Sequence, residues 1–161
     1  MPPSQTTRIL FVCLGNICRS PLAEGIFRHL AQERELAAQY EVDSAGTGAW
    51  HVGEPADPRS RGVARKHGIA LTGRARQVTG EDFHTFDLVI AMDRENRANL
   101  ERIRKSGDGR LHLLREFDPE ARGELEVPDP YYGAPGGFDE VYEMVHRSCR
   151  HLLETLESER R

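Results

Sequence analysis

Short, uninterrupted apolar runs alternate along the chain with longer segments in which apolar residues recur every three or four positions. Residues 8–13 and 86–92 are two such runs, and continuous runs of this length are typical of strands buried on both faces. Residues 40–45 and 111–114 predict two further strands. No apolar run approaches the ~20 residues that a membrane-spanning helix needs.

Helical periodicity fills the segments between these strands. The first predicted helix follows Ser20-Pro21, which is a good N-cap with proline at the first helical position. Three more predicted helices span residues 57–68, 93–105 and 138 to about 157. A loop rich in proline and glycine, residues 115–137, precedes the last of them.

The order of these elements is β-α-β-α-β-α-β-loop-α. Such alternation predicts an α/β fold, Rossmann-like or flavodoxin-like, with a four-stranded parallel sheet and helices on both faces. We expect one domain over residues 1–161, with residues 1–7 as a frayed leader. Ligands of such folds bind outside the carboxyl ends of the strands, and the first strand ends at Cys13.

Composition narrows the range of partners. The 161 residues are 38% hydrophobic and 30% charged, with a formal net charge of −4. A negative chain has no general attraction for nucleic acid or anionic membranes, so phosphate affinity must come from a local site. Three cysteines are too few for a disulfide scaffold, and no signal-peptide core follows Met1. We therefore expect a cytoplasmic monomer with free thiols.

The segment between the first strand and the first helix, residues 13–20, combines the groups that a phosphate ester needs. It contains no proline, so every amide can donate, and Gly15 and Asn16 tolerate unusual backbone angles. A helix N-terminus and the fork of Arg19 add positive charge. The same field favours the thiolate form of Cys13, so one loop supplies both an anion cradle and a nucleophile.

The residues alone leave structural interpretations open. A cysteine six positions before an arginine is a weak pattern, since Cys13 can be a buried strand-end thiol and Arg19 a surface cation. Asp129-Pro130 is a common way to open a turn. No metal site is predicted, because His146, Cys149 and His151 share the last helix without a fourth ligand nearby in sequence.

Two motifs carry a resemblance to a known family. Residues 13–21, Cys-Leu-Gly-Asn-Ile-Cys-Arg-Ser-Pro, resemble the active-site loop of the low-molecular-weight protein tyrosine phosphatases. Residues 129–133, Asp-Pro-Tyr-Tyr-Gly, are similar to the general-acid loop of that family. The likeness covers the chain from about residue 9 to residue 153, and two motifs in the right order and spacing make coincidence negligible.

The resemblance implies a phosphatase for phosphotyrosine in proteins that needs neither metal nor cofactor. It makes Cys13 the nucleophile, which becomes a phosphocysteine, and Arg19 the clamp for the phosphate oxygens. Asp129 becomes the proton donor to the leaving group, and Trp50, Tyr131 and Tyr132 wall the substrate ring. The remaining phosphate-loop residues that it implies are Leu14, Gly15, Asn16, Ile17, Cys18 and Ser20, with Ser20 donating to the sulfur.

The sequence departs from the family pattern at Gly73, where many members carry a histidine that supports the loop asparagine. The support of Asn16 is then left open between Thr72, Ser44 and a water molecule. A second open point is Cys18, five positions from Cys13 on one tight loop. We hypothesise that Cys18 traps oxidised Cys13 as a disulfide.

Three alternatives share this type of loop. Arsenate reductases of the same fold need two more cysteines around their middle helix, and residues 79–92 contain none. Protein-arginine phosphatases typically show threonine at the position of Ile17 and lack the paired tyrosines. A non-catalytic phosphate-binding module would not need both Cys13 and Asp129. We therefore expect a tyrosine phosphatase, with the arginine phosphatase and the arsenate reductase as alternatives.

Overall fold

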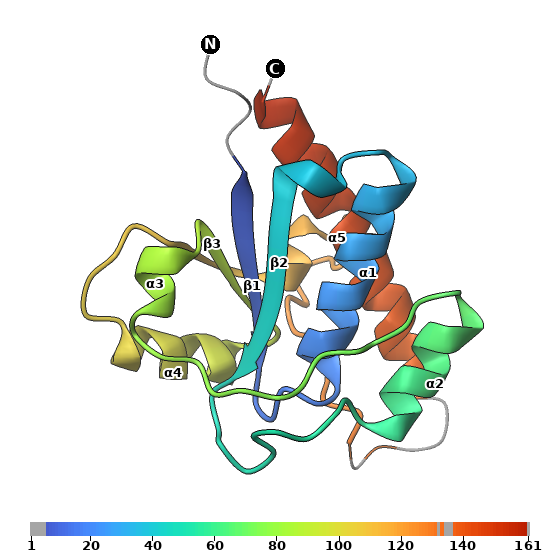
Figure 1. The fold of residues 1–161 in the computed structure, drawn as a ribbon, viewed down its shortest axis with the longest axis horizontal. Helices are drawn as coiled ribbons and strands as arrows, with labels where there is room; N and C mark the ends of the chain where they lie inside the picture. The colour runs from blue at the N-terminus through green and yellow to red at the C-terminus, as the bar shows by residue number, and fades with distance from the viewer. Residues whose placement is uncertain (1–5, 132, 134–136, 161) are drawn as a thin grey trace.

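The centre of the molecule is a four-stranded parallel sheet in the order β2-β1-β3-β4 (Figure 1). A computed structural model describes residues 6–131, 133 and 137–160 of the chain. The strands are β1 Thr7–Cys13, β2 Tyr40–Gly46, β3 Leu88–Ala91 and β4 Arg110–Leu113. The predicted fold class, a four-stranded parallel sheet with helices on both faces, is confirmed.

Helices cover both faces of this sheet. The α-helices are α1 Arg19–Glu33, α2 Pro58–Lys66, α3 Asp82–Thr85, α4 Arg94–Ile103 and α5 Gly137–Arg160. Two 3-10 turns, η1 Ala37–Gln39 and η2 Leu114–Phe117, add to them. Figure 1 shows α1, α2 and α5 on one side of the sheet and α3 and α4 on the other. Along the described residues, no helix combines the length and the apolar character of a membrane crossing.

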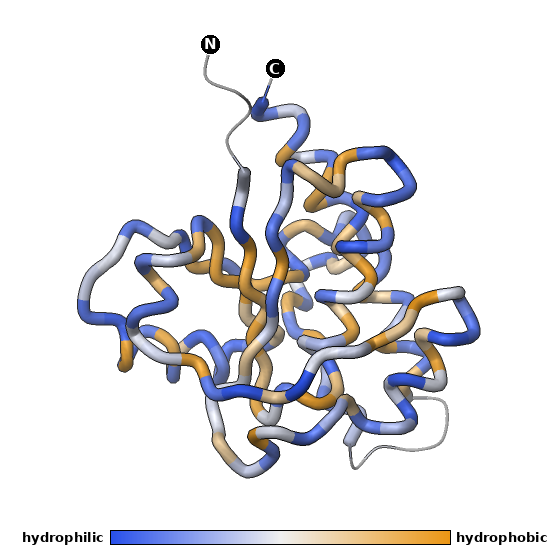
Figure 2. The backbone as a smooth tube through the Cα atoms, in the orientation of Figure 1, coloured by the Kyte–Doolittle hydropathy of each residue, from blue (hydrophilic) through white to orange (hydrophobic). Residues whose placement is uncertain are grey.

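The last five residues of β1, Ile9 to Cys13, are all apolar, and the packing of the strand explains why. Ile9, Phe11 and Cys13 face the larger core cluster with α1 and α5, whereas Leu10 and Val12 face a second cluster with α3 and α4. The two clusters exclude solvent from residues 9–13 of the strand, and Figure 2 shows hydrophobic residues concentrated in the central strands. A strand buried on both faces gains from apolar residues at every position rather than at alternate ones.

The observed boundaries differ from the expected ones where side chains have other tasks. Ser20 was expected to cap the first helix, and this expectation is wrong, because α1 already begins at Arg19 after Cys18. The Ser20 hydroxyl instead makes hydrogen bonds with the Cys13 thiol and with the side-chain amide of Asn16. Asp57 caps α2 as expected, accepting from the Arg59 amide at 2.8 Å. α3 has only four residues, too few to show helical periodicity.

The sheet order places one loop where ligands of such folds bind. β1 lies between β2 and β3, so the chain leaves β1 and returns to the sheet on one side and later on the other. This reversal is a topological switch point, and the crevice outside the carboxyl end of β1 is the expected binding site. Residues 14–18 and Asp93, which follows β3, lie at this edge.

Candidate active site

A pocket of about 320 Å³ opens at the carboxyl end of β1. It is lined by Cys13, Leu14, Gly15, Ile17, Cys18, Arg19, Trp50, His51, Asp129 and Tyr131. Nine of the twelve predicted site residues therefore line one hollow, although they come from three distant segments of the chain. Asn16 and Ser20 do not line the pocket, and Tyr132 lies outside the described residues.

Cys13 ends β1 at the bottom of this pocket, with a buried thiol. Its Sγ lies 3.0 Å from Ser20 Oγ. The Ser20 hydroxyl accepts a hydrogen bond from Asn16 Nδ2 at 2.8 Å, and its own proton can go to the sulfur or to the Ala45 carbonyl, 3.4 Å away. Because the sulfur is the nearer acceptor, the Ser20 hydroxyl is placed to stabilise a thiolate at Cys13.

Asn16 gives the loop its shape. Its backbone is left-handed, with φ of 58°, a conformation in which asparagine is enriched over most other residues. The side-chain amide is buried, donating to Ser20 Oγ and accepting from the Arg76 amide at 3.0 Å. The Arg76 side chain is itself fixed by ion pairs with Asp43 and Asp82. Asn16 therefore connects the nucleophile's partner to a neighbouring loop.

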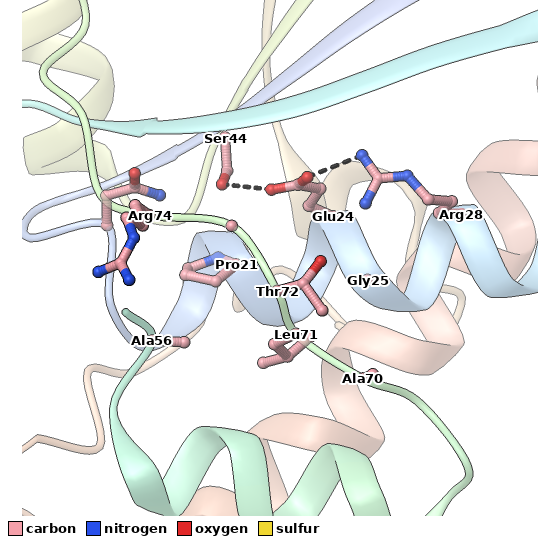
Figure 3. Close-up of a pocket in the computed structure, with 12 residues that line it drawn as sticks. Pro21, Glu24, Gly25, Arg28, Ser44, Ala56, Ala70, Leu71, Thr72 and Arg74 are labelled. Atoms are coloured by element: carbon pink, nitrogen blue, oxygen red, sulfur yellow. Dashed lines mark hydrogen bonds and ion pairs between the residues drawn. The ribbon is translucent and has the colours of Figure 1, made fainter. Parts of the chain in front are cut away.

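The position of Gly73 borders a small hollow behind the phosphate loop (Figure 3). Its volume is about 20 Å³, the space of a single water molecule. Ser44 donates to Glu24 at 2.6 Å, and Glu24 pairs with Arg28, as the dashed lines of Figure 3 show. Among the described residues, the side-chain hydrogen bonds of Asn16 go to Ser20 and Arg76 rather than to Ser44 or Thr72.

Arg19 has a fully buried side chain that is fixed on one edge only. Its Nη1 donates to Asp93 Oδ2 at 2.7 Å and to the Val127 carbonyl at 2.9 Å. Its buried Nε has no hydrogen-bond partner within the described part of the chain. Burial acts to lower the pKa of Arg19, but the charge of Cys13 and the hydrogen bond to Asp93 raise it above its ordinary value. A buried, unpaired N–H beside a pocket favours an anionic ligand there.

Asp129 lies at the rim of the pocket, with its side chain 40% exposed. Its Oδ1 accepts from the Tyr131 amide at 3.0 Å, which is the turn contact that an Asp-Pro sequence favours. Its Oδ2 faces Arg19 Nη2 at 3.6 Å. The two proposed roles of Asp129 therefore use different oxygens: Oδ1 makes the turn contact, and Oδ2 is the oxygen that a proton donor would use.

Aromatic side chains surround the mouth of the pocket. Trp50 is 72% exposed, and its ring lies so close to Gly48 that a Cβ there would be 1.9 Å from it. The rings of His51 and Tyr131 lie 6.3 Å apart. Gly48 is therefore a requirement for this placement of Trp50, and the resulting hollow can accept a flat ring above the phosphate loop.

The sequence pointed to the phosphate loop but not to all of its supports. Asp93, which holds Arg19, follows β3, and the carboxyl ends of parallel strands meet at one edge of a sheet. That rule is a signal that could have found Asp93. His51 lines the pocket from a loop without any pattern of its own.

Comparison with known proteins agrees with this geometry. The family model for the low molecular weight phosphotyrosine protein phosphatases matches residues 8–161. The chain belongs to this family. The low molecular weight protein-tyrosine-phosphatase of Streptomyces coelicolor is 46% identical over 151 residues, which is 92% of each protein. The resemblance found in the sequence is thus confirmed.

Solved structures of the low molecular weight phosphatase fold match nearly the whole chain. YfkJ from Bacillus subtilis has a TM-score of 0.90 at 40% identity and covers 98% of both chains. A Drosophila arginine phosphatase has a TM-score of 0.85 at 34% identity, covering 92% of this chain and 96% of its own. Because the fold of this chain matches both structures closely, the backbone alone does not distinguish a phosphatase for phosphotyrosine from one for phosphoarginine.

Oxidation of this phosphatase tests whether Cys18, the second cysteine of the loop, protects Cys13. Cys13 and Cys18 are both buried free thiols, and burial, together with the charge of Asp57, raises the pKa of Cys18. We expect peroxide to convert Cys13 to a sulfenic acid. The Cys18 thiol then attacks the sulfenic sulfur, the S–O bond breaks, and the hydroxyl leaves as water as the disulfide forms. Inactivation should be reversed by dithiothreitol in the unmodified protein.

In Cys18→Ser, a larger share of the activity lost to peroxide should be permanent, because the sulfenic acid is oxidised further. The measurement is p-nitrophenyl phosphatase activity before and after reduction. Cys149→Ser, which changes a buried thiol on α5, is the matched control. Equal recovery in Cys18→Ser and in the unmodified protein would leave Cys18 as a packing residue.

Proposed function

We propose that the chain hydrolyses phosphotyrosine in proteins, and aryl phosphates in general, through a phosphocysteine on Cys13. The observation that carries this proposal is the convergence of three groups in one pocket: Cys13 Sγ, the unpaired Nε of Arg19 and the carboxyl group of Asp129. A nucleophile, an anion clamp and a proton donor are what a phosphate monoester needs, with no metal or cofactor assigned a role.

In the first half of the reaction, the Cys13 thiolate attacks phosphorus as the bond from phosphorus to the ester oxygen breaks. The amides of residues 14–19 and the guanidinium of Arg19 stabilise the charge on the three equatorial oxygens. Asp129, protonated at this stage, gives its proton to the departing oxygen. The products of this step are the free phenol and a phosphocysteine.

In the second half, water attacks the phosphocysteine and the P–S bond breaks. The Asp129 carboxylate, now ionised, accepts a proton from that water. The hydroxyl of Ser20, 3.0 Å from Cys13 Sγ, stabilises the thiolate that leaves. Inorganic phosphate departs, and both groups return to their starting protonation states.

The shape of the site favours substrates that are long and flat. The nucleophile lies at the bottom of a hollow walled by Trp50 and Tyr131, so a short alkyl phosphate reaches it with fewer contacts than a phenyl phosphate. We include Tyr132 in this wall as a prediction. We further propose a cytoplasmic monomer that acts on phosphoproteins, without affinity for nucleic acid or membranes, in line with a net charge of −4.

The general acid is tested by Asp129→Asn, which keeps the size and the turn contact but has no proton to give. We expect kcat on phenyl phosphate to fall by roughly 10²–10⁴, the usual scale for lost acid catalysis. The loss should be much smaller on p-nitrophenyl phosphate, as long as phosphorylation of Cys13 limits the rate, because p-nitrophenolate departs without protonation. The activity of the unmodified protein should follow a bell-shaped pH profile centred on the acid side of neutrality. In Asp129→Asn the decline at higher pH, which reports the general acid, should be absent.

Asp108→Asn, an exposed carboxylate in a surface loop, is the control and should change neither ester. A uniform loss on both esters with an unchanged pH profile would assign Asp129 a structural role. The search for the acid would then turn first to Asp93.

Substrate class is tested with peptides carrying phosphotyrosine, phosphoserine or phosphoarginine at one position. We expect kcat/KM for phosphotyrosine to exceed that for phosphoserine by at least ~100-fold, a few kcal/mol of differential transition-state binding. The reason is the depth of the pocket, which a serine ester does not span. Equal rates would contradict the walled-pocket interpretation, and a preference for phosphoarginine would move the chain to the alternative activity.

A further inference from the structure

Arg59, in the first turn of α2, is attached to the phosphate loop through Asp57. Its Nε and Nη2 donate to the two carboxylate oxygens of Asp57 at 3.0 and 2.9 Å. The Asp57 side chain is only 7% exposed, and its backbone amide donates to the carbonyl of Ile17 in the phosphate loop at 2.8 Å. One side of the guanidinium is therefore fixed relative to the nucleophile's loop by a bidentate pair.

The other side of the same guanidinium reaches the loop that carries Asp129. Arg59 Nη1 donates to the Tyr131 carbonyl at 3.1 Å. The guanidinium carbon lies 5.2 Å from the centre of the Tyr131 ring and 4.7 Å from that of Phe138 at the start of α5. These are distances at which a cation is attracted to an aromatic face. Arg59 thus joins two segments that are about 70 residues apart in sequence.

Tyr131 is the residue through which this contact reaches the general acid. Its carbonyl accepts from Arg59, and its amide donates to Asp129 Oδ1 at 3.0 Å. With Oδ1 fixed in this way, Oδ2 is the oxygen that faces Arg19 and the pocket. A shift of the Tyr131 peptide would rotate or withdraw the carboxyl group, and misplacement by about 1 Å can cost 10²-fold in rate.

Asp57 is what makes Arg59 a defined support rather than a surface cation. Burial acts to raise the pKa of Asp57, but hydrogen bonds from the Arg59 side chain and amide outweigh it and hold the pKa below its ordinary value. The carboxylate therefore stays ionised over the working range of a phosphatase. Because both of its oxygens accept from Arg59, the plane of the guanidinium is set, and Nη1 is left to point at Tyr131.

We propose that Arg59 is a positioning residue for the general acid, holding the Asp129 loop over the phosphate loop through Asp57 on one side and Tyr131 on the other. This inference rests on the proposed role of Asp129. It assigns Arg59 no contact with the phosphate and no proton transfer. Its effect is predicted on the two proton transfers made by Asp129, and kcat/KM reports the first of them, the protonation of the leaving oxygen.

The test uses Arg59→Met, which keeps a long unbranched side chain without the charge, and Arg59→Lys, which keeps the charge but not the fork. We expect kcat/KM on phenyl phosphate to fall about 10–100-fold in both variants, within the range that misplacement of a catalytic group gives. On p-nitrophenyl phosphate the change should be less than about threefold, because that leaving group does not need the acid. Arg65→Met, an exposed arginine of the same helix, should leave both esters unchanged.

A double-mutant comparison separates positioning from general damage. In the Asp129→Asn background, Arg59→Met should cost nothing further on phenyl phosphate, because the group that it positions is gone. The proposal would be overturned if the loss in the double variant were the product of the losses in the two single variants. It would also be overturned if Arg59→Met and Arg59→Lys each lost the same factor on both esters. If Arg59→Met does not fold, as judged by its thermal unfolding, Arg59→Lys carries the same comparison.

The result for Asp129→Asn alone shows which proposal has failed. A leaving-group-dependent loss in Asp129→Asn combined with a leaving-group-independent loss in Arg59→Met overturns the role of Arg59 only. A uniform loss in Asp129→Asn removes the general acid itself, and the role of Arg59 is overturned together with it.

Discussion

Cys13→Ser is expected to bind inorganic phosphate as before while its turnover falls by several orders of magnitude. A serine hydroxyl does not ionise at neutral pH, so the nucleophile is lost. The anion cradle remains, because the amides of residues 14–19 and the Arg19 side chain do not depend on the sulfur. Since Ser20 Oγ is 3.0 Å from Sγ, the new hydroxyl also finds a hydrogen-bond partner in place.

Two measurements check this expectation. Initial rates on p-nitrophenyl phosphate give the loss of turnover, and calorimetric titration with phosphate gives the retained affinity. Cys149→Ser is the matched control, since Cys149 is also buried in the larger core cluster but lies on α5. Substantial turnover in Cys13→Ser would exclude the phosphocysteine intermediate, and loss of both binding and folding in it alone would assign Cys13 to the core.

Arg19→Lys is expected to be nearly inactive although it keeps the positive charge. The buried guanidinium holds Asp93 and the Val127 carbonyl with Nη1, its Nη2 lies 3.6 Å from Asp129, and its Nε has no hydrogen-bond partner among the described residues. A lysine ammonium is a point charge that cannot serve both sides in this geometry. We expect kcat/KM to fall by at least ~10³-fold on any ester, since the clamp acts on the phosphate and not on the leaving group.

Steady-state kinetics on phenyl and p-nitrophenyl phosphate check this prediction. The ratio of the two losses should be near one, unlike that of Asp129→Asn. Arg110→Lys, an exposed arginine at the start of β4, serves as the control for the substitution itself. A variant with near-normal rates would mean that the loop amides suffice to bind phosphate and that Arg19 belongs to the ion pair with Asp93.

Elements whose signal is local were predictable from the sequence. Residues 9–13 of β1 are all apolar because both faces of the strand are buried there, and the Asp57-Pro58 start of α2 is a cap formed within three residues. Ser20 shows the limit of such rules. Serine caps helices well and also stabilises a neighbouring thiolate, and the local pattern does not choose between the two tasks.

Contacts that depend on the folded backbone were not predictable. The support for Asn16 comes from the backbone amide of Arg76, a group that every residue except proline possesses and that no pattern singles out. The bridge made by Arg59 depends on α2 and the Asp129 loop meeting in space, although they are distant in sequence. Sequence reasoning therefore named most of the residues that line the pocket and missed most of those that hold them in place.

The packing of α5 has a consequence for when the protein becomes active during its synthesis. Val141, Val145 and Cys149 of this helix complete the same core cluster as Cys13, and the last turns of α5 bond to Tyr40 at the start of β2. At about 5–20 residues per second, the ribosome needs roughly 7–28 s to extend the chain from the phosphate loop to the end of α5. Through that interval the nascent chain carries its nucleophile without the core that shapes the loop around it. Phosphatase activity is therefore expected only after the last helix has packed on the core, and a chain released before that carries the whole phosphate-loop sequence without an assembled site.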